Sequence, residues 1–153
     1  MKTLFDADAR SSIRRRVDRL EPDSARQWGK MHAAQMVCHV ADQLRVALGE
    51  LDTAGKPGLL RFRPLRQLLV YWLPWPKGRI ETAPEMLTTM PLEWHDDVST
   101  LHVLIENFGK LDPVAKWAMH PMFGPLSGHE WGVLSWKHLD YHLQQFEVRH
   151  VIS

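Results

Sequence analysis

One segment of the chain carries an apolar repeat with the spacing of a packed α-helix. Large apolar residues recur there at alternating spacings of four and three: Trp94, Val98, Leu101, Ile105 and Phe108. This spacing places the five side chains on one stripe of an α-helix, as in the seam of a helical bundle. Gly109 follows the last of them and favours a helix end there. The segment therefore predicts one helix of a packed bundle.

Further segments have the length and the end signals of helices, and they lie at about residues 8–20, 31–48 and 127–146. Pro22 stops the first segment, and Gly49 is placed to end the second in the left-handed conformation. Ser127 and Glu130 stand at the spacing of a capping box, in which each side chain accepts a hydrogen bond from the other residue's backbone N–H. These signals predict three more helices.

The stretch between the second and third predicted helices is rich in proline, at positions 57, 64, 74, 76 and 84. Proline excludes a long helix there, so we expect short helical turns over residues 60–72. The aromatic segment at residues 71–78 fits a lid over one end of the bundle. No pair of strands is convincing, and residues 147–152 fit either a short strand or a frayed tail.

These elements make the fold class all-α, and we expect a four-helix bundle with a long Pro-rich connection between helices 2 and 3. A chain of 153 residues suits a single domain spanning residues 1–153. The Arg14–Arg16 run is interpreted as the solvated face of the first helix, because Ile13 and Val17 form the opposite stripe.

Charge and cysteine content restrict the classes of partner. The net charge is +1, from 19 basic and 18 acidic residues, so a nucleic-acid partner is not expected. Cys38 is the single cysteine, which excludes a disulfide within the chain and makes the cytoplasm the expected compartment. The most apolar run, residues 68–75, contains Pro74 and is too short to span a membrane, so no membrane association is expected.

Histidines are the residues that can carry chemistry. His138 and His142 are four residues apart on a predicted helix, so they share one face and lie about 6 Å apart along the axis, close enough to bind one metal ion. In the zinc-peptidase version of this spacing a glutamate follows the first histidine, and here that position is Leu139. The peptidase interpretation therefore fails, and a metal site needs a third ligand from elsewhere.

His39 is the best third ligand, because it lies in the most apolar helix, where an unpaired imidazole is costly to bury. A histidine from one helix meeting two from another is a usual way for bundles to build a metal site. Asp42, one turn later, can ligate directly or orient an imidazole. The alternative is that these are core histidines, each bonded to a carbonyl or a tyrosine hydroxyl.

Three further residues could contribute to a site: His120, His129 and Cys38. His120 and His129 flank the loop before the last helix and are placed to line the mouth of a pocket. Cys38 adjoins His39, which suggests a thiol nucleophile. Neighbouring helical residues point about 100° apart, however, so Cys38 is interpreted as a small core residue.

Three stretches of the sequence resemble a known superfamily. They are WGKMHAAQMVCHVADQLRVALGE, the WPKG segment followed by Pro84-Glu85, and HPMFGPLSGHEWGVLSWKHLDYHLQQF. These stretches are similar to the DinB/YfiT-like superfamily, and more narrowly to a bacterial branch known as a domain of unknown function. The resemblance covers roughly residues 10–148, and its most specific parts are the HPxFGxL loop and the last helix.

The resemblance implies a four-helix bundle in up-down-down-up order. It also implies a divalent metal ion, often Zn²⁺ or Ni²⁺, held by three histidines. By motif position these are His39, His138 and His142, the same trio that the spacing suggests. Dimerisation is a further property that the resemblance makes plausible.

We therefore expect a metal-dependent enzyme acting on an unidentified small molecule. An ion held by three histidines can activate water or a low-molecular-weight thiol, so the reaction is hydrolysis or thiol transfer, with the thiol as co-substrate. Asp42, Glu130 and His120 are the candidate proton acceptors. The alternative is a non-catalytic dimeric bundle in which the metal is absent or structural, and an open metal position facing a pocket would favour the enzyme.

Overall fold

The computed structural model describes residues 1–55, 58–79 and 88–146. Within them the chain is mostly helical, with four long helices: α1 (Ala7–Val17), α2 (Ala33–Leu48), α4 (Trp94–Gly109) and α5 (Gly128–Gln145). This composition is compatible with the predicted all-α bundle. No helix in these ranges has the length and apolar character needed to cross a membrane. The predicted strand or tail at 147–152 lies outside the described residues.

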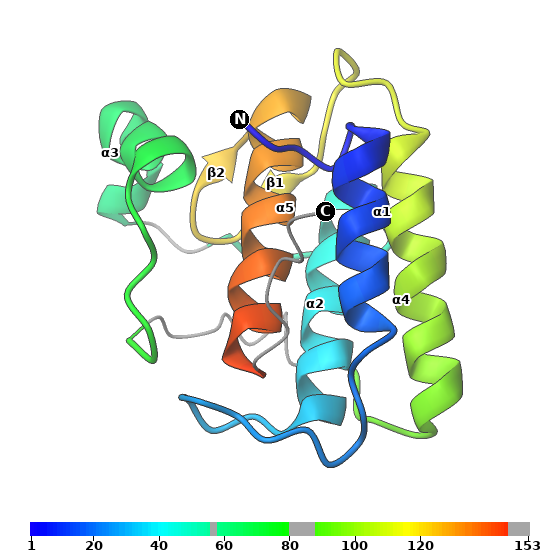
Figure 1. Ribbon diagram of the computed structural model, residues 1–153. Helices are drawn as coiled ribbons and strands as arrows, with labels where there is room; N and C mark the ends of the chain where they lie inside the picture. Colours follow the sequence, from blue (N-terminus) through cyan, green and yellow to red (C-terminus); the bar gives the residue numbers. More distant parts are fainter. Residues whose placement is uncertain (56–57, 80–87, 147–153) are drawn as a thin grey trace.

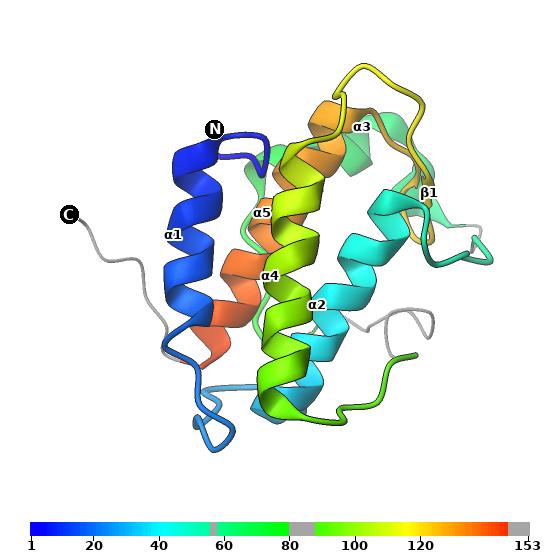
Figure 2. The same cartoon turned by 90° about the vertical axis from the view of Figure 1, so that its right-hand side faces the viewer.

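Each of the long helices packs against two others. Helix α1 contacts α4 and α5, and α2 contacts the same two helices. Helices α1 and α5 run in one direction along the molecule, and α2 and α4 run in the other (Figures 1 and 2). The adjacent helices α2 and α5 are therefore antiparallel, and side chains far apart in the sequence meet between them.

The Pro-rich connection forms short helical pieces, as its sequence predicts. These are a 3₁₀ turn η1 (Leu59–Arg61), the short helix α3 (Arg63–Gln67) and a π-helical turn η2 (Leu68–Trp72). Figure 1 shows α3 standing to one side of the long helices. Lys137 of α5 fixes this connection, because its Nζ donates to the carbonyl oxygens of Leu69 (2.8 Å) and Leu73 (2.5 Å).

A small hairpin precedes α5, and the sequence had not indicated it. Strand β1 (Met119–His120) pairs in antiparallel register with β2 (Gly124–Pro125). Strands of two residues are too short to show the apolar–polar alternation by which a strand is recognised. Gly124 has a φ of 72°, a left-handed conformation that glycine adopts without strain, and it lets the chain turn.

The predicted start of α5 and the predicted end of α2 are confirmed, whereas α1 ends at Val17, before the predicted end near residue 20. The Ser127 hydroxyl accepts from the Glu130 N–H at 3.2 Å, and the Glu130 carboxylate accepts from the Ser127 N–H at 2.8 Å. Gly49 ends α2 with a φ of 75°. The start of α2 has an unexpected cap, because His32 and Gln35 form the same reciprocal pair of hydrogen bonds.

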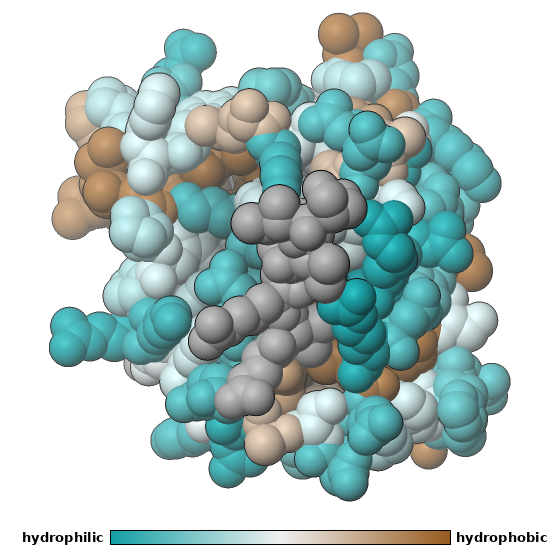
Figure 3. Space-filling model, viewed as in Figure 1, coloured by the Kyte–Doolittle hydropathy of each residue, from teal (hydrophilic) through white to brown (hydrophobic). Residues whose placement is uncertain are grey.

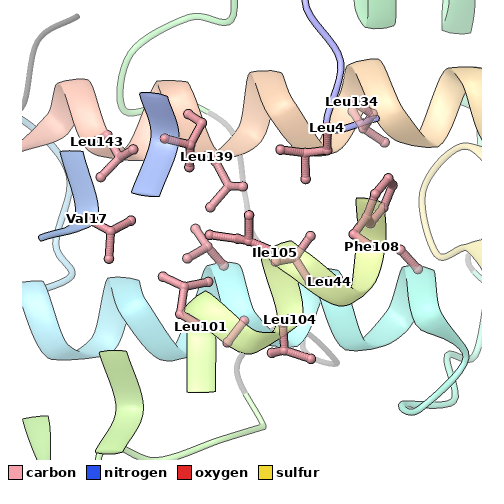
Figure 4. Packing of buried hydrophobic residues seen from close by; sticks show 14 of the residues in the cluster. Leu4, Val17, Leu44, Leu101, Leu104, Ile105, Phe108, Leu134, Leu139 and Leu143 are labelled. Carbon is pink, nitrogen blue, oxygen red and sulfur yellow. The ribbon is translucent and has the colours of Figure 1, made fainter. Parts of the chain in front are cut away.

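Aliphatic and aromatic side chains fill the space between the long helices (Figure 4). Leu101, Ile105 and Phe108 of the predicted seam are fully buried, and Trp94 and Val98 are partly buried against the same cluster. Leu44 of α2 and a row from α5 complete the cluster, including Leu134, Leu139 and Leu143. The periodicity of the sequence therefore identified the face of α4 that packs.

The predicted solvated face of α1 is wrong at one position. Arg15 is exposed, but Arg16 is 2% exposed and its guanidinium pairs with Asp140 of α5 at 2.6 Å. Arg16 is three residues after Ile13, so it shares the apolar face rather than the solvated one. An ion pair between helices thus lies within the packed part of the molecule.

Candidate metal centre

Three histidines from two helices meet at one point. Helix α2 supplies His39, and α5 supplies His138 and His142 from successive turns. The Nε2 atom of His39 lies 3.0 Å from Nε2 of His138 and 3.1 Å from Nε2 of His142. All three side chains are buried. The structure thus brings together the trio that the sequence suggested.

The spacing of these nitrogens suits a single ion. The potential ligand atoms of the trio lie within 4.8 Å of one another, so the group can hold a metal ion. Two nitrogens bound to one tetrahedral Zn²⁺ at about 2.0–2.1 Å would be about 3.3 Å apart, close to the separations found. The chemistry of the donor set therefore fits a divalent ion that prefers imidazole.

A glutamine fixes which nitrogen of His142 carries the proton. The amide nitrogen of Gln145 donates to the backbone carbonyl of Trp28 at 2.6 Å, which leaves its oxygen facing Nδ1 of His142 at 2.9 Å. Nδ1 must therefore donate, and Nε2 presents its lone pair to Nε2 of His39. Metal-binding histidines usually have such a partner on the far nitrogen. Gln145 was not predicted as a site residue, although it lies three residues after His142 on the same helical face.

The surroundings keep His138 and His142 neutral. Burial, followed by the charge of His39, lowers the pKa of His142 to about 3, although the hydrogen bond to Gln145 opposes the shift. Burial, followed by the charges of His142 and His39, also moves the pKa of His138 well below its usual value. A neutral imidazole is the form that binds a metal ion.

A cavity of about 690 Å³ opens beside the histidines, and all three belong to its lining. Most of the remaining wall is aromatic or aliphatic, formed by residues such as Met31, Leu69, Trp28, Trp75, Phe123 and Tyr141. This size and composition are typical of a small-molecule site. Because the cluster lies on the cavity wall, a small molecule can approach the histidine nitrogens.

One hydroxyl group joins two segments of the cavity wall. The Tyr141 hydroxyl accepts from the indole N–H of Trp28 (3.2 Å) and the backbone N–H of Gly78 (3.0 Å), and donates to the carbonyl of Pro76 (3.3 Å). Trp75, Pro76 and Gly78 of the predicted lid line the cavity, while Trp72 is exposed. The C-terminal part of this segment therefore forms part of the cavity wall.

The two candidate carboxylates are engaged elsewhere. Asp42 accepts from Arg45 (2.7 Å) and from the backbone N–H (2.9 Å) and hydroxyl (2.6 Å) of Thr89. Glu130 caps α5 and pairs with Arg66 at 3.4 Å. Among the described residues, neither carboxylate belongs to the cavity lining. The structure does not bring them to the histidine cluster.

Of the three remaining candidate residues, one lines the cavity and two do not. His120 lines the cavity, and burial lowers its pKa to about 3. His129 is exposed and stacks on Tyr71, with ring centroids 5.9 Å apart. Cys38 is buried, and burial, followed by the charges of Asp97 and Asp42, raises the pKa of its thiol to about 11. The interpretation of Cys38 as a core residue is confirmed, because such a thiol stays protonated and unreactive.

The fold and the site together define a helical protein with a buried three-histidine cluster that opens on an apolar cavity. The chain belongs to the family described as "Protein of unknown function (DUF1569)", whose model matches residues 3–149. No curated protein and no solved structure matches the chain.

Proposed function

We propose that this chain is a metal-dependent enzyme in which His39, His138 and His142 hold one divalent ion, with Zn²⁺ or Ni²⁺ as the best candidates. The observation that carries the proposal is the convergence of three buried Nε2 atoms, 3.0 and 3.1 Å apart, on the wall of a cavity. Three protein ligands beside an accessible position are the usual arrangement of a catalytic zinc site, whereas a structural site has four.

The course of the helices supports kinship with the DinB-like superfamily. Helices α1 and α5 share one direction and α2 and α4 share the other, which agrees with an up-down-down-up order (Figure 1). The histidines that the structure brings together are also the three that the resemblance implies. We infer that the chain is a four-helix bundle of this superfamily.

A divalent ion at this site would supply Lewis acidity and make a water molecule or a small thiol nucleophilic at neutral pH. The chain's own residues perform the other tasks. The three histidines bind, and Gln145 keeps His142 in the binding tautomer. The aromatic walls hold an apolar substrate and keep bulk water away from the cluster. This arrangement serves hydrolysis and thiol transfer equally well.

Metal content is the test. Tag-free wild-type protein is reconstituted with Zn²⁺ or Ni²⁺, dialysed and analysed by elemental mass spectrometry beside His138→Ala and the exposed control His129→Ala. We expect about one ion per chain in the wild type and the control, and loss of the ion in His138→Ala. Absence of metal from all three proteins after reconstitution would overturn the proposal.

The alternative is a non-catalytic dimeric bundle, and one surface feature favours it. Apolar side chains gather at the outer side of the connection around α3, where Figure 3 shows a hydrophobic area. Leu59, Phe62 and Trp72 are 82%, 65% and 75% exposed there. A metal-free protein that sediments as a dimer, and that Phe62→Ser converts to a monomer, would support this alternative. The cytoplasmic location and the absence of a nucleic-acid partner stay predictions.

A further inference from the structure

The ring of His120 is held by the backbone that follows it. Its Nδ1 accepts hydrogen bonds from the N–H groups of Met122 and Phe123, both at 3.1 Å. A backbone N–H always donates, so Nδ1 must present its lone pair to both groups. A neutral imidazole carries one proton, and that proton therefore lies on Nε2. The hairpin loop thus selects the tautomer of His120.

Packing prevents the ring from turning away. The ring centroid lies 4.8 Å from that of Phe123 and 5.2 Å from that of Trp131. Trp131 is itself fixed, because its indole N–H donates to the carbonyl of Ala118 at 2.9 Å. His120 is 4% exposed. Two aromatic rings and two backbone donors therefore define one orientation of this side chain.

The remaining edge of the ring belongs to the cavity. His120 lines the same cavity as His39, His138 and His142. Its Nε2 forms no hydrogen bond within the described part of the chain. Unlike Nδ1 of His138, which is fully enclosed and has no hydrogen-bond partner, Nε2 of His120 is not fully enclosed by protein atoms. The Nε2–H group is therefore open to the cavity. A donor in apolar surroundings is stabilised by an acceptor that a ligand brings.

We propose that His120 is a fixed hydrogen-bond donor for an oxygen atom of the substrate, and that the cavity takes an aromatic or apolar compound with a carbonyl or similar oxygen. This deepens the proposed function and rests on it only for the reaction, since the donor exists without a metal ion. The aromatic walls at Trp28, Trp75 and Tyr141 suit the body of such a compound. The role differs from that of a proton acceptor, because the basic nitrogen of His120 already serves the backbone.

A pair of ligands of the same shape tests the proposal. Acetophenone has a C=O group where α-methylstyrene has C=CH₂, so the difference in affinity measures the contribution of the oxygen. Binding is followed by tryptophan fluorescence on the full chain stripped of metal by a chelator, so that the carbonyl cannot coordinate an ion. We expect wild-type protein to bind acetophenone about five- to tenfold more tightly, the contribution of one hydrogen bond.

Two substitutions at the same position separate the donor from the loop contacts. His120→Asn retains an oxygen near the place of Nδ1 for the two backbone N–H groups but removes the donor, so we expect the preference for acetophenone to disappear. His120→Gln places an amide N–H near Nε2, so we expect it to keep part of the preference. His129→Asn, the same change at an exposed position, should leave the preference intact. Equal preference in wild type and His120→Asn would overturn the proposal, as would its absence in wild type.

Nuclear magnetic resonance reads the tautomer directly. Long-range ¹H–¹⁵N correlation of the wild type, with the signal assigned by its loss in His120→Asn, should show a neutral ring protonated at Nε2. A ring protonated at Nδ1 or at both nitrogens would overturn the proposal. Both measurements are independent of metal binding, so a protein that holds no metal but shows the carbonyl preference would refute the proposed function alone.

Discussion

Helices α2 and α5 each present two unlike sides. On the side facing α1 and α4, residues such as Leu44, Leu139 and Leu143 pack in the apolar cluster (Figure 4). On the other side, His39 and His138 lie on the wall of a cavity. The filled side contributes stability through burial and close packing. The hollow side buries imidazole nitrogens, which is costly until a ligand binds them.

The comparison predicts that substitutions on the two sides affect different measurements. A change on the filled side should lower the free energy of unfolding and leave the affinity for metal unaltered in the folded protein. A change on the hollow side should alter ligand affinity and the dependence of stability on pH. The experiments below test this separation.

The largest effect is expected for Phe108→Ala, in the part of α4 that packs against the filled side. Phe108 is fully buried, so its truncation leaves a cavity and should cost about 3–5 kcal/mol of the free energy of unfolding, measured with urea. Val103→Ala, on the exposed face of the same helix, should change stability by about 0.5 kcal/mol or less. Similar losses in the two variants would show that this side is not closely packed.

Acid should lower the free energy of unfolding, because histidines that line the cavity are buried in their neutral form. The folded-state pKa of His120 and of His142 is lowered to about 3 from an unfolded value of about 6.5. Between these values the unfolded chain binds protons that the folded chain refuses, so stability falls as pH falls below about 6.5. Each of the two histidines should remove about 2 kcal/mol between pH 7 and pH 5 in the metal-free protein, measured by urea unfolding.

A matched pair of variants identifies the histidines responsible for this loss. His120→Asn should reduce the loss between pH 7 and pH 5 by about 2 kcal/mol. His95→Asn replaces an exposed histidine and should not change it. Equal stability of the wild type at the two pH values would contradict the expectation.

The next effect concerns the glutamine that orients His142. Gln145→Leu removes the acceptor of the His142 Nδ1–H, so metal affinity measured by calorimetry should fall about 10- to 100-fold. Gln144→Leu makes the same change at an exposed neighbouring position and should preserve the affinity. Undiminished affinity in Gln145→Leu would mean that the hydrogen bond does not orient the ligand.

The smallest effect is expected at the start of α5. Ser127→Ala removes the hydroxyl that accepts from the Glu130 N–H and should cost about 1 kcal/mol of stability. Ser99→Ala, on an exposed face of α4, is the control and should have almost no effect. A change of metal affinity in Ser127→Ala would show that the two sides of α5 are coupled more tightly than the comparison allows.

The sequence predicted the features that depend on local spacing. The repeat from Trp94 to Phe108 located α4, and the pattern of Ser127 and Glu130 located the start of α5, because helix geometry relates residues three and four apart. The same geometry related His138 to His142. His39 was found because an imidazole in an apolar helix needs a partner.

Features that depend on distant pairing were missed. Asp42 and Glu130 were predicted as proton acceptors of the site, but Thr89 and Arg66, remote in the chain, bind them. The burial of Arg16 likewise depends on Asp140, which is 124 positions away. Local patterns contain no information on such partners, since the fold alone brings them together.

Two stretches separated by nearly fifty residues form hydrogen bonds with the same oxygen atom. The Tyr141 hydroxyl holds Trp28 on one side and the segment at Pro76 and Gly78 on the other, and both border the cavity. The two borders of the cavity are consequently linked through one side chain, and loss of this phenol would remove hydrogen bonds from both of them.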